Sequence, residues 1–224
     1  LIPFKVTHDQ ANDTFARWVA SLWFRPNDLK RMARVNAIDG VYAPFWTFDA
    51  KAETRWTAES GYYYYENEEY TDSDGKRQTR QVRRTRWERS KGKHRGDYDD
   101  LLICASKGLN ERLVRILEPF NTQQNLVPYS AKYLSGWGAE EYAVEPKDAW
   151  KKGQKRFEEH EYDACRREVP GDTHRDLNIS MRLSDVTWKH CLLPVYVAAY
   201  RYNDKTYRFL VNGESGKVSG EAPY

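Results

Sequence analysis

The sequence predicts an α+β fold in which an antiparallel β-sheet with long hairpins is flanked by about four helices. Phe, Trp and Tyr make up 14% of the 224 residues, and aromatic side chains favour strands. Short apolar or alternating segments are separated by Asp-Gly, Asn-Asp and Asn-Gly, which are typical of hairpin turns. Four other segments carry helix-start residues or apolar side chains at helical spacing.

The first helix is expected to begin at a capping box, in which the Thr7 hydroxyl and the Gln10 side chain satisfy backbone N–H groups. One apolar face then follows at helical spacing: Phe15, Trp18, Val19 and Leu22. Pro26 is tolerated in the first turn of a helix, which predicts a second, short helix over residues 27–34.

Residues 41–48 and 61–65 are expected to form strands, because they are rich in aromatic residues. Residues 72–75 read Asp-Ser-Asp-Gly and predict a tight turn, since Asp-Gly tolerates positive φ. Residues 78–87 are then the return strand of a long hairpin, and residues 99–105 form another short strand.

Residues 110–120 are expected to be helical, with Leu113, Ile116 and Leu117 on one face. Residues 121–138 are marked by Pro, Gly and Ser and are expected to be irregular. The chain ends in strands separated by turns at Asn203-Asp204 and Asn212-Gly213: residues 176–183, 186–202 and 206–211.

The longest helix is expected over residues 146–168. Its apolar face should lie across the sheet: Trp150, Gly153, Phe157 and Ala164. The opposite side is densely charged, and the acidic residues between positions 158 and 163 are expected to be solvated.

No low-complexity linker divides the chain, so residues 1–224 are expected to form a single α+β domain. Cys104, Cys165 and Cys191 are isolated, which argues against a disulfide framework and for a reducing compartment. The longest apolar stretch, residues 191–200, is too short for a membrane-spanning helix, which needs about 20 residues.

The predicted hairpin carries opposite charge on its two strands. Residues 51–75 contain seven acids and two bases, whereas residues 76–95 contain ten bases and one acid. If the segments pair, opposite charges face each other and contribute about 0.2–1 kcal/mol per pair, and we expect Glu66, Glu68 and Glu69 to lie opposite arginines. The alternative is a surface for nucleic acid or an anionic membrane, with these candidate residues: Arg80, Arg83, Arg84, Arg86 and Arg89.

Four consecutive tyrosines in this hairpin form a candidate aromatic surface: Tyr62, Tyr63, Tyr64 and Tyr65. Their rings could stack on bases or contact a protein partner. Successive strand side chains point to opposite faces, so two rings are expected on each face. A place in the core and at its rim is the simpler interpretation.

Nucleophile-elbow, zinc-protease, phosphate-loop and dinucleotide motifs are absent from the sequence. The five histidines are scattered, and their spacing does not resemble a zinc site. We therefore predict no catalytic residue, no metal site and no cofactor in this chain, and a function in binding. An enzyme of unknown reaction is the third alternative.

Several segments spread over the chain resemble one family: LIPFKVT (1–7), LWFRPNDL (22–29), GVYAPFWTF (40–48), VTWKHCLLPVY (186–196), YRFLVNG (207–213) and GKVSGE (216–221). Together they resemble the bacterial zinc-ribbon membrane proteins, also labelled TFIIB-type zinc-ribbon or primosomal protein N′-like. In that family a four-cysteine zinc ribbon precedes the first segment, and hydrophobic segments follow the last. The resemblance implies that this chain is the middle domain, with zinc bound in a ribbon outside it.

The resemblance also implies a function. Relatives accompany membrane-stress and membrane-scaffold proteins of the phage-shock and SPFH type. This implies a membrane-tethered adaptor or scaffold at the cytoplasmic face of the membrane, docking a protein partner. The primosomal label suggests instead a nucleic-acid-associated accessory protein that uses the basic strand, residues 76–95. We rank the adaptor first, the nucleic-acid protein second and the enzyme third.

Overall fold

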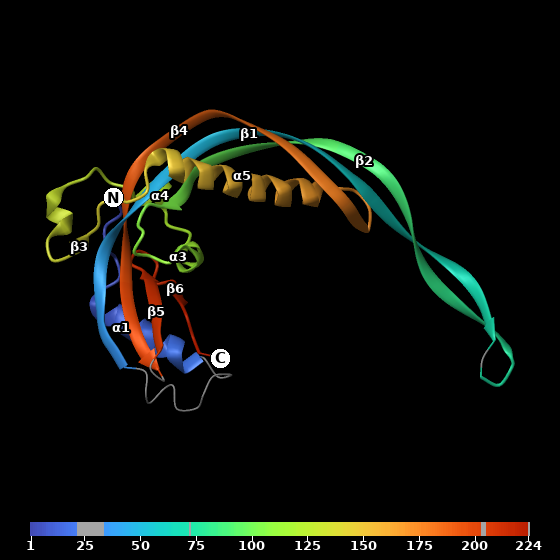
Figure 1. Cartoon of the computed structure of the whole chain (residues 1–224), viewed down its shortest axis with the longest axis horizontal. Helices are drawn as coiled ribbons and strands as arrows, with labels where there is room; N and C mark the ends of the chain where they lie inside the picture. Colours follow the sequence, from blue (N-terminus) through green and yellow to red (C-terminus); the bar gives the residue numbers. More distant parts are fainter. Residues whose placement is uncertain (22–33, 72, 203–204, 224) are drawn as a thin grey trace. The chain divides into compact units, whose positions relative to one another are not determined.

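The computed structural model describes residues 1–21, 34–71, 73–202 and 205–223 (Figure 1). Its elements are, in chain order, α1 (His8–Ser21), β1 (Arg34–Thr71), β2 (Arg77–Cys104), α3 (Glu111–Leu117), α4 (Thr122–Asn125), the 3-10 helix η1 (Ala131–Leu134), β3 (Gly138–Ala139), α5 (Pro146–Glu168), β4 (Thr173–Tyr202), β5 (Lys205–Asn212) and β6 (Val218–Gly220). The strands form one sheet in the order β2-β1-β4-β5-β6, and the short β3 pairs in parallel with β1. The predicted α+β class, a large antiparallel sheet with helices beside it, is confirmed.

Three strands are far longer than predicted. β1 has 38 residues, β2 has 28 and β4 has 30, and each joins segments that were expected to be separate strands. Asp185 lies at one such expected boundary, yet β4 continues through it with a φ of 52°. Local irregularities of this kind bend a strand without ending its pairing, so a polar residue inside an apolar pattern was mistaken for a strand end.

The described residues group into two compact units, each built from segments far apart in the sequence. The first contains Leu1–Phe48, Asp100–Gly153 and Trp188–Tyr224, and the second contains Asp49–Asp99 and Gln154–Thr187. The long strands and α5 contribute to both units. The single domain expected over residues 1–224 stays a prediction.

The helix expected over residues 27–34 and the turn residues Asn203 and Asp204 lie outside the described residues, except that Arg34 begins β1.

The sheet of the first unit has a hydrophobic cluster on each face. Leu193 and Val195 of β4 belong to the cluster that contains the buried residues of α3. Tyr196 and Tyr200 belong to the cluster that contains the buried residues of α1. Because neighbouring strand residues point to opposite faces, the most apolar part of β4 supplies both clusters at once. This explains why residues 191–200 read as a nearly continuous apolar stretch.

α1 begins at the capping box that the sequence predicted. The Thr7 N–H donates to Gln10 Oε1 at 2.9 Å, and the Gln10 N–H donates to Thr7 Oγ1 at 3.3 Å. Phe15 and Val19 are buried as expected, and Trp18 is half-buried. Both backbone donors at the start of the helix are therefore satisfied locally. Leu22, the last residue of the expected face, lies outside the described residues.

α3 is capped by Asn110, whose side chain accepts hydrogen bonds from two backbone N–H groups of the first turn. Leu113 and Leu117 are buried as predicted, but Ile116 is 45% exposed, so its predicted place on the buried face is wrong. Val114 takes that place, because the cluster covers the side of the helix on which positions 113, 114 and 117 meet. The segment expected to be irregular, residues 121–138, contains α4 and η1.

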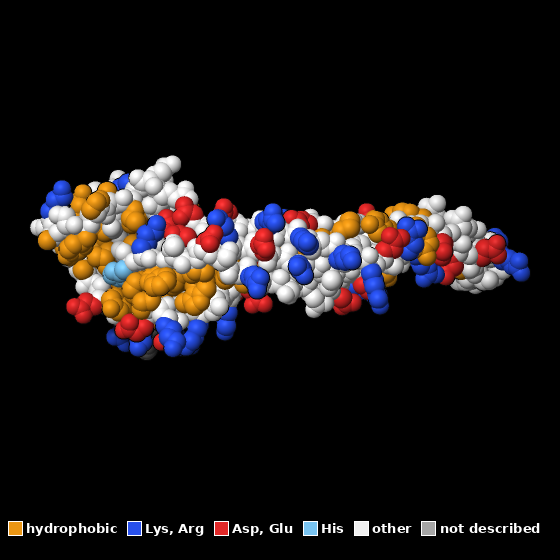
Figure 2. Space-filling model, turned by 90° about the horizontal axis from the view of Figure 1, so that it is seen from above, with side chains coloured by type: hydrophobic (Ala, Val, Ile, Leu, Met, Phe, Trp, Pro, Cys, Tyr) orange, Lys and Arg blue, Asp and Glu red, His pale blue; other side chains and the backbone are white. Residues whose placement is uncertain are grey.

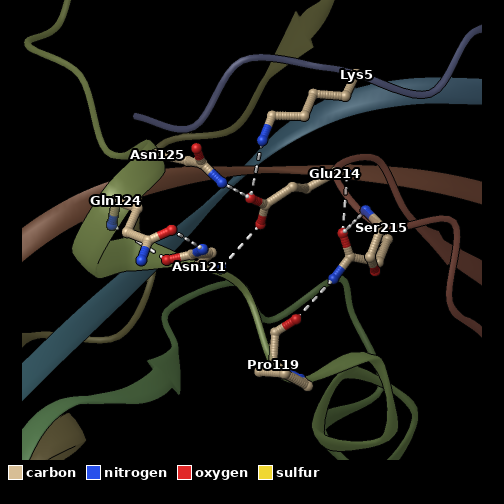
Figure 3. Close-up of polar contacts among 8 residues, drawn as sticks. Lys5, Pro119, Asn121, Gln124, Asn125, Glu214 and Ser215 are labelled. Atoms are coloured by element: carbon tan, nitrogen blue, oxygen red, sulfur yellow. Dashed lines mark hydrogen bonds and ion pairs between the residues drawn. The ribbon is translucent and has the colours of Figure 1, made fainter.

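A polar network around Glu214 joins three segments of the first unit (Figure 3). The Glu214 side chain is only 7% exposed. Its carboxylate accepts hydrogen bonds from the Asn121 N–H at 2.9 Å and from Asn125 Nδ2, and it lies 3.4 Å from Lys5 Nζ. The turn after β5 is thereby tied both to α4 and to the N-terminal segment.

Asn212, fully buried at the end of β5, completes this network from the other side. Its Nδ2 donates to the carbonyl oxygens of Leu117 (3.0 Å) and Pro119 (3.3 Å). Its Oδ1 accepts from the N–H groups of Glu214 (2.8 Å) and Ser215 (3.0 Å). One side chain thus satisfies four backbone groups, two at and just after the end of α3 and two in the turn after β5.

In the second unit, burial alternates along the strands. Ala52, Thr54, Trp56, Ala58 and Ser60 are buried, and the residues between them face outward. Residues 154–168 of α5 cover the buried face (Figure 1), where Trp56 and Ala58 form a cluster with Cys165. Along β1, contacts at Ser60 and then Glu68 meet Ser90 and then Arg80 of β2, so these two strands run antiparallel. Contacts at Asp49 and then Glu59 meet Thr187 and then Arg175 of β4, so β1 and β4 are antiparallel as well.

α5 has the bounds that the sequence predicted, Pro146–Glu168. Gly153, Phe157 and Ala164 are buried as expected, and Trp150 is half-buried beside Phe48. Glu161 is the exception: it was expected among solvated acids, but it is 0% exposed. The expectation was wrong because Glu161 follows Phe157 by four positions and precedes Ala164 by three, which places it on the covered face.

Candidate functional site

Beyond Gly61 the second unit continues as a two-stranded arm, defined here as residues 62–71 of β1 and 77–86 of β2. The third strand, β4, begins at Thr173 beside Gly61, where the Asp172 N–H donates to the Gly61 carbonyl (2.8 Å). In the described part of the chain, no third strand therefore pairs with the arm. None of the arm residues is buried. Gly75 has a φ of 76°, which confirms the predicted turn at residues 73–75, while Asp72 lies outside the described residues. A bare two-stranded hairpin is marginally stable in water, so its side-chain contacts are important.

Ion pairs across the arm confirm the predicted charge pairing at two of three positions. Arg80 lies 2.7 Å from Glu68, and Arg84 lies 3.5 Å from Glu68 and 3.6 Å from Glu66. The hydrogen bonds from Arg80 hold the pKa of Glu68 below its ordinary value. Glu69, the third acid, has no ion-pair partner among the described residues. These pairs are exposed to solvent, so each contributes little to stability.

Arginine side chains also lie over the tyrosine rings of the arm. The guanidinium of Arg83 is 4.3 Å from the centre of the Tyr63 ring, and that of Arg86 is 5.9 Å from the Tyr62 ring. Arg86 additionally pairs with Glu88 at 3.0 Å. These contacts hold large side chains in place on an otherwise bare hairpin.

The expected place of the four tyrosines in the core is wrong. Tyr63, Tyr64 and Tyr65 are exposed by 38%, 43% and 65%, and Tyr62 is half-buried. Successive tyrosines point to opposite faces, as in any strand. However, β4 begins only at Thr173 beside Gly61, and α5 ends at Glu168, so nothing in the described residues covers either face of the arm. The candidate aromatic surface is thus an exposed one.

Arg89 differs from the other candidate arginines. It lies on β2 beyond residue 86, outside the arm, and it has no ion-pair partner among the described residues. Its side chain lines a shallow hollow of about 430 Å³ with Lys91 and Thr57. Four of the five candidate arginines therefore lie on the arm, where each contacts a carboxylate or a tyrosine ring. The fifth, Arg89, lies on the three-stranded part of the sheet without an ion-pair partner among the described residues.

A polar cluster that the sequence did not reveal lies between α5 and β2, with Glu161 buried and Glu168 exposed. The Tyr98 hydroxyl donates to Glu161 Oε1 at 2.6 Å, while Glu161 Oε2 has no hydrogen-bond partner among the described residues. His94 Nδ1 lies 2.7 Å from Glu168 Oε1, and Trp56 Nε1 donates to Glu168 Oε2 at 3.3 Å. The hydrogen bond with His94 lowers the pKa of Glu168. Burial, with the bond to Glu161, raises the pKa of Tyr98, so the phenol stays a donor at neutral pH.

The cysteines of the chain are buried thiols. Burial raises the pKa of Cys104 to about 11 and that of Cys191 to about 12. Burial and then the charges of Glu161 and Glu168 raise the pKa of Cys165 to about 11. Since the thiolate is the reactive form, these thiols are poor nucleophiles at neutral pH.

Replacing Tyr98 with phenylalanine is expected to destabilise the protein by about 1–3 kcal/mol, because it leaves a buried carboxylate without its donor. Urea unfolding followed by tryptophan fluorescence measures the change. The double variant Tyr98→Phe/Glu161→Leu removes both polar partners and should recover much of the loss. A double variant less stable than Tyr98→Phe would contradict this account.

In the part of the chain that the structure describes, no histidine or cysteine belongs to a group of three potential ligands close enough to hold one metal ion. None of the described helices combines the length and apolar character needed to cross a membrane.

Comparisons with known proteins give one relative. The chain is 25% identical over 229 residues to "Uncharacterized protein YdjG" of Bacillus subtilis (strain 168). The similarity covers 100% of this chain and 63% of the relative, so the chain spans less than two thirds of the relative's length. No family model and no solved structure matches the chain. The resemblance to zinc-ribbon membrane proteins stays a prediction.

Proposed function

We propose that this chain is a non-enzymatic adaptor domain, tethered at the cytoplasmic face of a membrane, that docks a protein partner through the arm. The observation that carries the proposal is the arm itself, which exposes Tyr63, Tyr64 and Tyr65 on a hairpin without a core. Tyr and Arg are enriched at protein interfaces, because they combine large contact area with polar groups. The resemblance adds the type of partner: a membrane scaffold of the phage-shock or SPFH type.

Nucleic-acid binding along the arm has less support. Arg80 and Arg84 are paired with glutamates, and Arg83 lies over the Tyr63 ring. An arginine already paired contributes little to counterion release, which dominates affinity for nucleic acid.

The experiment that tests this function is site-specific photo-crosslinking in cells. A photoreactive residue at Tyr65, which is 65% exposed, is expected to give one discrete adduct with a partner protein. The same residue at Tyr129 is the matched control, because Tyr129 is also 65% exposed and lies in the first unit. Replacing Tyr63 and Tyr64 with serine should reduce the Tyr65 adduct about tenfold or more, as for a hot-spot residue. Equal adducts at both positions, or none at Tyr65, would exclude the arm as the docking surface.

A further inference from the structure

Within the described ranges of the chain, the sheet of the second unit has one face covered by α5 and one face without a helix. On β2 the outward residues alternate with half-buried ones from position 89 to position 97, and on β4 they alternate from position 177 to position 183. We call the outward side of β1, β2 and β4 within this unit the bare face. Figure 2 views the molecule from the side opposite α5, and Lys and Arg side chains gather there.

Some cations of the bare face are neutralised by neighbours on the adjacent strand. Arg95 lies 3.3 Å from Glu53, Arg175 lies 2.5 Å from Glu59, and Lys51 lies 2.8 Å from Asp185. Five others have no ion-pair partner within the described part of the chain: Arg55, Arg89, Lys91, Lys93 and Arg182. These five unpaired cations come from three strands, so no single segment of the sequence displays them together.

A hollow of about 320 Å³ lies among these side chains. Its lining includes Arg55, Lys93 and Arg182, together with the ion pair of Arg95 and Glu53. Like charges gathered around a hollow raise the local positive potential, and an anion that enters it relieves their repulsion. The hollow therefore has the size and the charge for a phosphate-bearing group.

We infer that the bare face docks on a bilayer of anionic phospholipid, with headgroup phosphates among the five unpaired cations. The cations form a two-dimensional array, about 13 Å along β2 from Arg89 to Lys93 and about 10 Å across three strands. Cations spread over three neighbouring strands suit an extended anionic surface, whereas duplex nucleic acid is read by a helix or ribbon that enters a groove. This inference stands apart from the protein partner on the arm.

Aromatic residues extend the array on the same side. Trp87 occupies an outward position next to Gly61, whose neighbours include the Trp87 ring, and Arg175 lies 4.2 Å from the centre of that ring. Trp and Tyr are the residues that favour the headgroup level of a membrane, where one end of the ring is wet and the other is apolar. The bare face thus combines the two features of a membrane-surface site.

The test is a vesicle partition assay with the purified chain. Vesicles of equal parts phosphatidylglycerol and phosphatidylcholine are compared with vesicles of phosphatidylcholine alone. Binding is expected only to the anionic vesicles, and it should fall steeply as ionic strength rises above about 0.1 M. The variant Arg55→Gln/Lys93→Gln/Arg182→Gln should weaken the partition roughly 100-fold, because each cation near an anionic surface contributes about fivefold.

The matched control is Arg80→Gln/Arg84→Gln/Arg86→Gln, which changes the net charge equally but removes cations that are already paired on the arm. It should weaken the partition by no more than about threefold, since paired cations add little attraction to the surface. Thermal melts of both variants check their folding. Arg55, Lys93 and Arg182 have no ion-pair partner among the described residues, so their variant should melt like the unaltered chain.

Three results would overturn the inference. If the two triple variants weakened vesicle binding equally, the net charge of the chain alone would determine binding. Tighter binding to duplex DNA than to anionic vesicles at the same salt would make nucleic acid the ligand. Release from the vesicles by millimolar inorganic phosphate at constant ionic strength would indicate a site for a soluble anion. The Tyr65 crosslink should survive the bare-face variant, so failure of this inference and failure of the proposed function remain distinguishable.

Discussion

Replacing Phe157 with alanine is expected to lower the free energy of unfolding of the second unit by about 3–5 kcal/mol. Phe157 is 0% exposed, and its ring meets the Tyr98 ring edge-on with the centroids 5.1 Å apart. The substitution removes buried apolar surface and leaves a cavity between α5 and the sheet. It also removes the contact that holds Tyr98 against Glu161. Urea unfolding with tryptophan fluorescence measures the loss.

The control for Phe157 is Tyr162→Ala on the same helix. Tyr162 is 41% exposed, so its replacement should change the stability by no more than about 0.5 kcal/mol. Alanine is at least as good a helix former as either residue, which removes helix propensity as an explanation. If Phe157→Ala and Tyr162→Ala unfolded at the same urea concentration, α5 would not be packed as described.

Replacing Asn212 with alanine is expected to cost about 2–4 kcal/mol. The side chain is fully buried, donates to the carbonyl oxygens of Leu117 and Pro119 and accepts from the N–H groups of Glu214 and Ser215. Alanine cannot replace any of these bonds, and the buried groups left unpaired carry their full desolvation cost. The expected loss therefore exceeds that of an ordinary surface hydrogen bond. Thermal and urea unfolding both report it.

Ser215→Ala is the control for the Asn212 network. Ser215 is exposed, and its hydroxyl only accepts from the Lys217 N–H at 3.4 Å. A change within about 0.5 kcal/mol is expected. The Asn212 account would fail if Asn212→Ala were as mild as this control.

Elements that depend on near neighbours were predictable. The capping box at Thr7 and Gln10 and the bounds of α5 follow from residues within three or four positions of one another. The pairing of Glu66 and Glu68 with arginines also followed from the sequence, because a turn signal at residues 73–75 sets the partner strand beside its neighbour. In each case the deciding contact is local along the chain or is joined through a short turn.

The candidate arm was only half predictable. The sequence displayed its tyrosines and arginines, but their exposure depends on where β4 begins and α5 ends, at Thr173 and Glu168. These elements lie about a hundred residues further along the chain, so no pattern within the hairpin shows that it extends beyond the sheet. The core placement expected for Tyr62 to Tyr65 failed for this reason.

By itself the sequence determined the fold class, the capping box of α1, the long helix and the opposite charges of the hairpin, because these follow from local spacing and turn chemistry. Only the tertiary structure decided that Glu161 is buried and that Arg55, Lys93 and Arg182 meet on one face. Arg55, Lys93 and Arg182 lie on three different strands of the sheet. Burial and charge neutralisation depend on which strands become neighbours, and that pairing is a property of the whole sheet.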